Sequence, residues 1–382
     1  MAKRTASPAG VPAHLPPRHA RIRSALLSKR LDGIILTTPA DLGYVTGVAW
    51  EDTWGVLTHN RLTLISDFRY QTHLAELSGW ARRYIRKTTQ SLADALADVV
   101  IGEKLQRVGF EPAWISVASF RLAQTQLRKH ARRGKPPAMV PVRELMLNQR
   151  KVKDAFEIAA IRRAVDVAEG AYGAVRPELR AGMTENEIAG RMEFEMRRRG
   201  ASSGSFETDV GVGANTALPH YRPGAVPLQA GKALLFDWGA KVDYYCSDIT
   251  RTHLFGRPDP KMREIYQVTL EAQLAAISAI RPGVSNRSVD KVARDIIRKA
   301  GYGKHFGHSL GHGIGLAVHE MPRLGPSAAE ETLQPGMIVT VEPGIYLAGV
   351  GGVRIEDDVL VTDRGCEVLT SLDTSYEGAC LE

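Results

Sequence analysis

The pattern of apolar and polar positions divides the chain into two regions. Between residues 20 and 145, apolar runs at 33–37 and 62–66 predict buried strands, 92–105 has helical spacing, and 108–110 starts another strand. Strands that alternate with helices predict an α/β domain. Proline and basic residues interrupt the pattern at 134–150, and Pro, Ala and basic residues fill the N-terminus. We therefore predict a disordered tail at 1–19, one domain at 20–145 and a second at 146–382.

In the second region one order of elements occurs twice. An apolar stripe at helical spacing covers 158–175, and Thr184 and Glu187 form a capping box at the start of the next helix. Asp259 and Ser285 precede two further helices. Strand-like runs follow each helix pair, at 233–237, 246–250, 337–342 and 353–356. The repeated order of helix, helix and hairpin predicts an α+β domain with pseudo-twofold symmetry.

Each predicted hairpin carries two acidic residues. In the first, a reverse turn centred between 242 and 243 would place Asp237 directly opposite Asp248. In the second, a turn centred on Gly349 within the glycine-rich segment would place Glu342 directly opposite Glu356. Directly opposed residues share a face, and like charges so placed are costly unless a cation neutralises them. Four such carboxylates around a pseudo-twofold axis indicate about two divalent ions.

A glycine-rich segment offers nitrogen ligands. Residues 307–315 contain His308 and His312 among four glycines, and His319 follows. A lone core histidine is usually structural, but three beside glycine-rich turns indicate a site. Carboxylates with one imidazole and no thiolate favour Mn²⁺ and also admit Co²⁺, Zn²⁺ or Fe²⁺. Two such ions polarise a carbonyl and activate water, which is the equipment of a hydrolase.

At these residues the sequence resembles a known family, the pita-bread metallopeptidases, and within it the Xaa-Pro branch of prolidase and aminopeptidase P. The resemblance runs from about Lys153 to Thr370, and more loosely over an N-terminal domain similar to that of creatinase and prolidase. The matching segments are 236–240, 247–252, 307–316, 318–320, 342–344 and 353–357. The implied fold is an α/β N-terminal domain followed by a pita-bread catalytic domain.

The resemblance implies a role for each acidic residue and for one histidine. Asp237 would bind one ion, His312 and Glu342 would bind the other, and Asp248 and Glu356 would bridge the two. All five ligand positions of the family pattern are filled in this sequence.

The resemblance also implies residues that handle the substrate. His220 would line the substrate site, and His308 and His319 would contact the substrate and stabilise the tetrahedral intermediate. Arg354 would orient the last ligand. Glu342 would shuttle a proton to the leaving nitrogen. The implied substrates are dipeptides or short peptides with an Xaa-Pro bond, and the implied assembly is a homodimer.

Three alternatives remain open at this level. A creatinase-like amidinohydrolase uses no metal, and a non-catalytic binding protein on the same fold needs none; both tolerate lost ligands. Methionine aminopeptidase lacks so large an N-terminal domain. Prolidase and aminopeptidase P differ in whether anything beyond the proline fits, and the compact N-terminal domain favours the dipeptidase.

Composition adds limits on location and partners. The net charge is +8, and residues 1–150 hold 23 Lys and Arg against 11 Asp and Glu. The densest basic run, 128–133, has no interleaved aromatic residue, so we predict no nucleic-acid partner. Three widely spaced cysteines fit a reducing compartment, and no apolar run is long enough for a membrane helix. We expect a cytoplasmic protein with no membrane contact.

Overall fold

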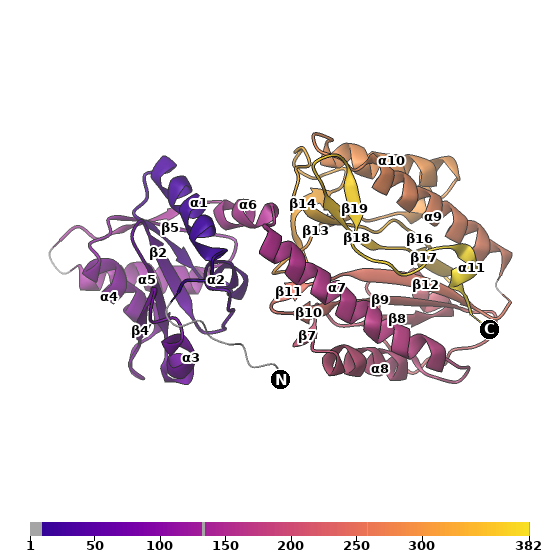
Figure 1. Ribbon diagram of the computed structural model, residues 1–382, viewed down its shortest axis with the longest axis horizontal. Coiled ribbons are helices and arrows are strands. Elements are labelled where there is room, and N and C mark those ends of the chain that lie inside the picture. Colours follow the sequence, from indigo (N-terminus) through magenta and orange to yellow (C-terminus); the bar gives the residue numbers. More distant parts are fainter. Residues whose placement is uncertain (1–9, 132–133, 258, 382) are drawn as a thin grey trace. The chain divides into compact units, whose positions relative to one another are not determined.

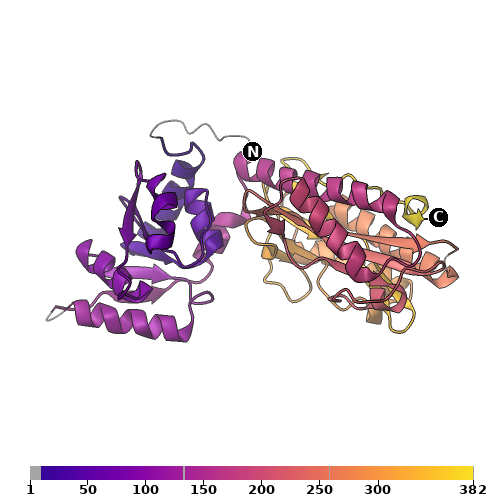
Figure 2. The same cartoon turned by 90° about the horizontal axis from the view of Figure 1, so that it is seen from below.

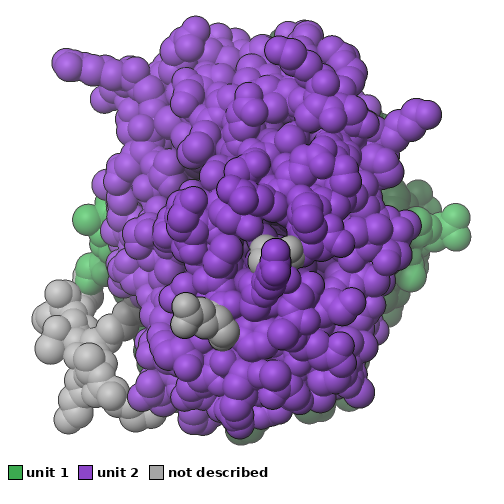
Figure 3. All heavy atoms as spheres, turned by 90° about the vertical axis from the view of Figure 1, so that its right-hand side faces the viewer, with its two compact units in different colours: residues 1–150 green, residues 151–382 purple. Residues whose placement is uncertain are grey.

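The structure is a computed structural model that describes residues 10–131, 134–257 and 259–381. It consists of two compact units, residues 1–150 and 151–382, which Figure 3 colours separately. Residues 1–9 of the predicted tail lie outside the described part of the chain. The tail prediction is wrong for residues 15–19, which begin helix α1, Leu15–Ser28. The prolines in its first turn are tolerated there because those backbone N–H groups have no intrahelical partner.

The N-terminal unit is a mixed six-stranded sheet with helices, as the α/β prediction requires. The strand order is β4-β3-β2-β1-β5-β6, with β1 antiparallel to β2 and parallel to β5. The strands are β1 Gly33–Leu36, β2 Trp54–Thr58, β3 Leu62–Ser66, β4 Ala81–Ile85, β5 Arg107–Phe110 and β6 Ala138–Pro141. The other helices are α2 Pro39–Thr46, α3 Gln71–Ala75, α4 Leu92–Gly102, α5 Val117–His130 and α6 Leu145–Lys151, with a 3-10 helix at Phe68–Tyr70. Helices α4 and α5 share one buried core with strands β1 and β5.

The second unit, residues 151–382, corresponds to the predicted catalytic domain and is named the catalytic unit for that reason. It contains two halves of similar order. The first half, residues 155–255, holds α7 Ala155–Val175, α8 Glu185–Arg198, β7 Ser203–Gly204, β8 Asp209–Val212, β9 Ala233–Trp238, β10 Ala240–Val242, β11 Tyr245–Cys246 and β12 Ile249–Phe255. The second half, residues 260–368, holds α9 Pro260–Ala279, α10 Asn286–Lys299, β13 Gly311–Gly313, β14 Glu320–Leu324, β15 Ile338–Val341, β16 Gly344–Leu347, β17 Gly351–Arg354, β18 Asp357–Val361 and β19 Cys366–Val368. Short 3-10 helices lie at Arg176–Glu178, Gly213–Ala217 and Gly303–His305, and the chain closes with α11 Tyr376–Ala379 and β20 Cys380–Leu381.

Each half has a hydrophobic core of its own. In the first half, Tyr172 of α7 stacks on Trp238 of β9 with ring centroids 5.2 Å apart. In the second, Val289 and Ile297 of α10 are buried with Val339 of β15. In Figures 1 and 2 the strands of this unit lie between the α7–α8 pair and the α9–α10 pair. The predicted pita-bread arrangement, in which two helix pairs enclose strands that bear the acidic residues, is confirmed.

The predicted helix starts are largely observed. Asp259 caps α9 by accepting the N–H of Lys261 at 2.7 Å. Thr184 accepts the N–H of Glu187 at 3.2 Å, but the reciprocal half of the predicted capping box is absent because the Glu187 carboxylate instead pairs with Arg191. Within the described residues, no helix combines the length and the apolar character that a membrane span requires.

Candidate metal centre

The acidic residues of the second half face each other as predicted. Gly344 pairs with Arg354 in the β16–β17 ladder, and Val341 pairs with Asp357 in the β15–β18 ladder. The two ladders share one register, so Glu342 and Glu356 stand opposite each other between them. The register centred on Gly349 is therefore confirmed.

The register predicted for the first half is wrong, because the turn is centred one residue later and each pairing partner is therefore shifted by two residues. Val242 pairs with Tyr245, so the turn is formed by Asp243 and Tyr244, which have φ angles of 49° and 73°. Two left-handed residues make the kind of two-residue turn that matches strand twist, although this one contains no glycine. Asp237 consequently lies opposite Thr250. Asp248 precedes that position by two residues, at the break between β11 and β12, so the two acids are diagonal neighbours.

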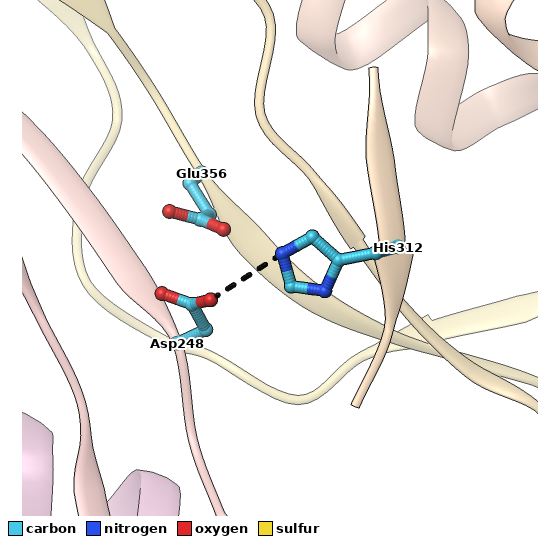
Figure 4. A group of neighbouring side chains, drawn as sticks. All are labelled: Asp248, His312 and Glu356. Atoms are coloured by element: carbon cyan, nitrogen blue, oxygen red, sulfur yellow. Dashed lines mark ion pairs between the residues drawn. The ribbon is translucent and has the colours of Figure 1, made fainter. Parts of the chain in front are cut away.

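His312 presents an unprotonated nitrogen to the acidic residues. Its Nδ1–H donates to the carbonyl oxygen of Gly313 at 3.1 Å, which leaves the Nε2 lone pair free. Nε2 lies 3.7 Å from Asp248 Oδ2 and 3.4 Å from Glu342 Oε1. One potential ligand atom from each of Asp248, His312 and Glu356 lies within 4.8 Å of the others, and Figure 4 shows the three side chains converging. A lone pair and carboxylate oxygens that point at one space repel each other unless a cation lies between them.

The electrostatics of this cluster fit a divalent cation. Burial and the neighbouring acids raise the pKa of Asp248 and Glu356 well above the ordinary range. Burial likewise raises the pKa of Glu342 to about 8 and lowers the pKa of His312 to about 3. Oδ1 of Asp237 is buried and has no hydrogen-bond partner among the described residues. A metal ion would supply the positive charge that these groups lack.

Glycine allows the backbone to approach this site closely. A Cβ atom at Gly311 would collide with the Thr340 carbonyl, and one at Gly313 would collide with the Met321 carbonyl. Both residues belong to β13, which carries His312 and lies between β14 and β15. The glycine density of 307–315 is therefore explained by the packing that brings His312 up to the acidic residues, as the sequence indicated.

Each half of the unit orients the acidic residues of the other. Arg354 of the second half donates to Asp237 of the first. Thr250 Oγ1 of the first half donates to Glu356 Oε2 at 2.6 Å, and Arg251 donates to the Glu356 carbonyl at 2.6 Å. These contacts hold the carboxylates in place without adding a metal ligand.

Two side chains of this support were missed in the sequence. Thr250 lies opposite Asp237 only in the true register, so the register error concealed it. The Tyr346 hydroxyl accepts from Arg354 NH1 and donates to His308 Nε2, both at 2.9 Å. Tyr346 stands four residues beyond Glu342 in an ordinary strand pattern, and no local signal marked it.

The predicted substrate-side residues share a pocket with the metal-ligand candidates. This pocket of about 670 Å³ lies within the catalytic unit and is lined by all nine predicted residues: His220, Asp237, Asp248, His308, His312, His319, Glu342, Arg354 and Glu356. The His319 ring lies 4.4 Å from the His312 ring, centroid to centroid. His308 is held by Tyr346 and by the Ser309 carbonyl, and burial lowers its pKa to about 4.

Charged side chains that were not predicted also line the pocket. Arg323 of β14 pairs in register with His312, its side chain is exposed, and it forms no ion pair with any residue that the structure describes. Asp209, the first residue of β8, lies directly opposite Asp237. A pocket with metal-ligand candidates on its wall and single charges of both signs is suited to a small charged substrate.

Comparison with known proteins places the chain in a family. Residues 159–363 match metallopeptidase family M24, and residues 18–152 match the creatinase/prolidase N-terminal domain. The uncharacterized peptidase YqhT of Bacillus subtilis (strain 168) is 34% identical over 92% of this chain and 96% of its own length.

Two solved structures are similar over nearly the whole chain. The Xaa-Pro dipeptidase from Bacillus anthracis has a TM-score of 0.88 and 35% identity, covering 96% of this chain and 100% of that one. The X-Pro aminopeptidase from Thermotoga maritima MSB8 has a TM-score of 0.85 and 33% identity, covering 94% and 98%. The chain belongs to metallopeptidase family M24 and carries a creatinase/prolidase-type N-terminal domain.

Proposed function

We propose that this protein is a metal-dependent peptidase that cleaves the bond between an N-terminal residue and a following proline. The observation that carries the proposal is the convergence of four acidic residues, of which Asp248 and Glu356 are buried, and one unprotonated imidazole nitrogen on the wall of a single pocket. The similarity of the chain to an Xaa-Pro dipeptidase and to an X-Pro aminopeptidase supports the same substrate class. A metal-free amidinohydrolase or a binding protein has no need of this set of acids.

We assign the metal ligands as the sequence implied. Asp237 would hold one ion, His312 and Glu342 would hold the other, and Asp248 and Glu356 would serve both. Oxygen ligands with one imidazole favour Mn²⁺, and the same set admits Co²⁺, Zn²⁺ or Fe²⁺. Ions held there would polarise the scissile carbonyl and activate the attacking water.

The side chains of the pocket carry the remaining steps. Glu342 takes the proton of the attacking water and returns it to the proline nitrogen as the bond breaks. His319 donates to the oxyanion that develops on the scissile carbonyl. Arg354 and Tyr346 keep Asp237 and His308 in place through hydrogen bonds. His220, at the pocket wall, contacts the bound peptide.

Arg323 favours a dipeptidase over an enzyme for longer peptides. Its guanidinium faces the pocket without an ion-pair partner among the described residues, and it lies close enough to His319 to lower the pKa of that imidazole after burial. A cation in this place can neutralise the carboxylate of a proline that ends the substrate. A longer peptide offers a neutral amide at the same point.

The proposal includes a cytoplasmic homodimer. Three free cysteines, Cys246, Cys366 and Cys380, fit a reducing compartment. The dimer rests on the family resemblance.

A hydrolysis panel tests the activity directly. Ala-Pro, Ala-Pro-Gly and Ala-Ala are offered to metal-free protein reconstituted with Mn²⁺, Co²⁺ or Zn²⁺. We expect fastest cleavage of Ala-Pro with Mn²⁺, slower cleavage of the tripeptide and little of Ala-Ala. Rapid cleavage of the tripeptide would show that the protein is an X-Pro aminopeptidase and not a dipeptidase. Metal-independent cleavage of a guanidino substrate, with no peptide cleaved, would favour the amidinohydrolase.

A further inference from the structure

We propose that Asp209 is a specificity-determining residue that binds the free N-terminal ammonium group of the substrate. This inference deepens the proposed function and rests on it. In this proposal Asp209, in the first half of the catalytic unit, recognises the ammonium end of a zwitterionic dipeptide. Arg323, in the second half, faces the carboxylate end.

Asp209 lies beside the metal centre without belonging to it. It is the first residue of β8 and is paired in register with Asp237. Paired residues on adjacent antiparallel strands have Cβ atoms about 4.5–5.5 Å apart on the same face, so both carboxylates face the pocket. The backbone N–H of Tyr221 also donates to Asp209, which ties the carboxylate to the segment that bears His220.

No cation within the described part of the chain pairs with Asp209. The neighbouring Glu207, by contrast, lies 3.6 Å from Arg222 across the exposed rim. Arg354 lies near enough to attract Asp209 electrostatically, but its side-chain hydrogen bonds go to Asp237, Thr250 and Tyr346. A half-buried carboxylate without a counter-charge is unfavourable, so a ligand that brings a cation gains from binding there.

The second half has no equivalent of Asp209. The position opposite Glu342 is held by Leu310, whose carbonyl accepts the N–H of Glu342 at 2.8 Å and whose side chain is fully buried. The pseudo-twofold fold therefore does not require an acidic residue here. The proposed ligand set does not require one either, because it is complete without Asp209. The additional carboxylate in one half alone points to recognition of a substrate that differs at its two ends.

The chemistry of the substrate places its ammonium group within reach. In an Xaa-Pro dipeptide a single carbon separates the N-terminal nitrogen from the scissile carbonyl. When that carbonyl lies over the acidic residues, the ammonium group lies beside Asp237, and Asp209 is the adjacent carboxylate. One Asp237 oxygen is held by Arg354 and the other is assigned to a metal ion, which leaves Asp209 as the acceptor. A charge-assisted hydrogen bond of this kind is short and strong in a partly buried site.

The test compares a substrate that has the ammonium group with one that lacks it. Wild type, Asp209→Asn and the control Asp243→Asn, which removes an exposed carboxylate on the β10–β11 turn, are assayed as manganese-loaded proteins. The substrates are Ala-Pro, propionyl-proline and Lys-Pro. Propionyl-proline differs from Ala-Pro only by loss of the amine. Where its turnover is too slow to measure, its inhibition constant against Ala-Pro supplies the comparison.

We expect Asp209→Asn to lower kcat/KM for Ala-Pro by about 10- to 100-fold, mainly through KM, because one charge-assisted hydrogen bond is lost. The value for propionyl-proline should change by less than about twofold, since that ligand has no ammonium group. The kcat/KM of this variant for Lys-Pro should fall by the same factor as that for Ala-Pro. Asp209→Glu should recover part of the loss. Metal content and melting temperature of Asp209→Asn should not fall, and Asp243→Asn should match wild type throughout.

Other outcomes overturn the inference. An equal loss for Ala-Pro and propionyl-proline, or a lower metal content, would make Asp209 a support of the metal centre. A loss of kcat/KM confined to Lys-Pro would show that Asp209 recognises the side chain of the N-terminal residue and not its ammonium group. No loss at all would remove its role, while cleavage of Ala-Pro by wild type would leave the proposed function intact. If wild type cleaves no Xaa-Pro dipeptide, the proposed function fails first and this inference falls with it.

Discussion

The two halves of the catalytic unit hold their acidic residues in different ways. In the second half Glu342 and Glu356 stand opposite each other between two ladders of one register. In the first, Asp237 faces Thr250, and Asp248 lies at a break between two strands. The pairing in the first half is thus displaced by two residues relative to a strict repeat of the second. Exact symmetry is unnecessary, because a metal centre needs converging oxygen atoms and not equivalent backbone positions.

The halves also depend on each other. Arg354 of the second half fixes Asp237 of the first, and Thr250 and Arg251 of the first half fix Glu356 of the second. The N–H of Asp248 donates to Asp358 Oδ2 at 3.1 Å across the same boundary. Each half therefore helps to orient the acidic residues of the other. Metal binding and the packing of the two halves should be thermodynamically linked.

Removal of metal should have the largest effect. We expect chelation to abolish Ala-Pro hydrolysis and Mn²⁺ or Co²⁺ to restore it. The unfolding free energy should fall by about 2.7 kcal/mol for each site that had been held at 100 times its dissociation constant. Activity assays and denaturant melts, with elemental analysis, measure both. Full activity in verified metal-free protein would contradict a metal mechanism.

The metal-free protein should also respond to pH. The pKa of Glu342 is raised from its ordinary value of 4.5 to about 8, so the folded state binds a proton that the unfolded state has released. The contribution of Glu342 to stability is therefore fully present below about pH 4.5 and is lost as pH rises toward about 8. Bound metal keeps the acid ionised and should remove this slope. Parallel pH profiles with and without Mn²⁺ would contradict the account.

Substitution of a proposed bridging residue should have the next largest effect on metal content and activity. Glu356→Ala should lose both ions at micromolar metal if its carboxylate bridges them as proposed, whereas Asp237→Ala should lose one. The acidic residues that remain would share too little positive charge, so their pKa values rise and residual activity needs a higher pH. Elemental analysis and a pH–rate profile measure these effects. Two tightly bound ions in Glu356→Ala would show that it does not bridge.

The histidines should separate metal binding from turnover. His312→Ala should reduce metal content, because its Nε2 faces Asp248 and Glu342. His319→Ala should retain metal and lose about 10²–10³-fold in kcat, the scale of one lost oxyanion donor. Both quantities are measured on the same preparations. Equal metal loss in the two variants would refute the assignment.

Local signals in the sequence predicted much of this architecture. Strand β3 was placed at 62–66, and Asp259 was recognised as a helix cap, because both depend on residues within a few positions. Nine candidate site residues were predicted from motifs, and the structure brings them to one pocket.

Contacts between the halves could not be predicted from local patterns. Thr250 and Glu356 are 106 residues apart, and Arg354 and Asp237 are 117 apart. Such pairs depend on how the two halves pack and on a register set by a turn whose residues gave no glycine signal. The missed support of Glu356 by Thr250 has this cause. Tyr346 contacts Arg354 and His308 within the second half, and Asp209 faces Asp237 within the first, but neither residue carried a local sequence signal.

Loss of one contact between the halves should have a moderate effect. Thr250→Val removes the hydroxyl that donates to Glu356 at 2.6 Å but keeps the side-chain volume. We expect metal affinity to fall by about 10- to 100-fold, as for other groups that orient a ligand. Thr250→Ser, which keeps the hydroxyl, is the matched control and should retain most of the affinity. Equal affinities in both variants, measured by metal titration, would show that the contact does not matter.

The smallest effect should come from the turn that displaces the first half. Asp243 has a φ of 49°, a conformation that Asn tolerates and a β-branched residue does not. Asp243→Val should lower the unfolding free energy by about 1–2 kcal/mol, the cost of one left-handed residue. Asp243→Asn removes only an exposed ion pair with Arg163, so its stability should stay within about 0.5 kcal/mol of wild type. Denaturant melts of the two variants measure the difference. Metal content should be unchanged in both, because the β9–β12 ladder holds Asp237 opposite Thr250 independently of the turn. If Asp243→Val instead lost metal at unchanged stability, the turn itself would set the position of Asp248, and the displacement between the halves would be a requirement of the metal centre.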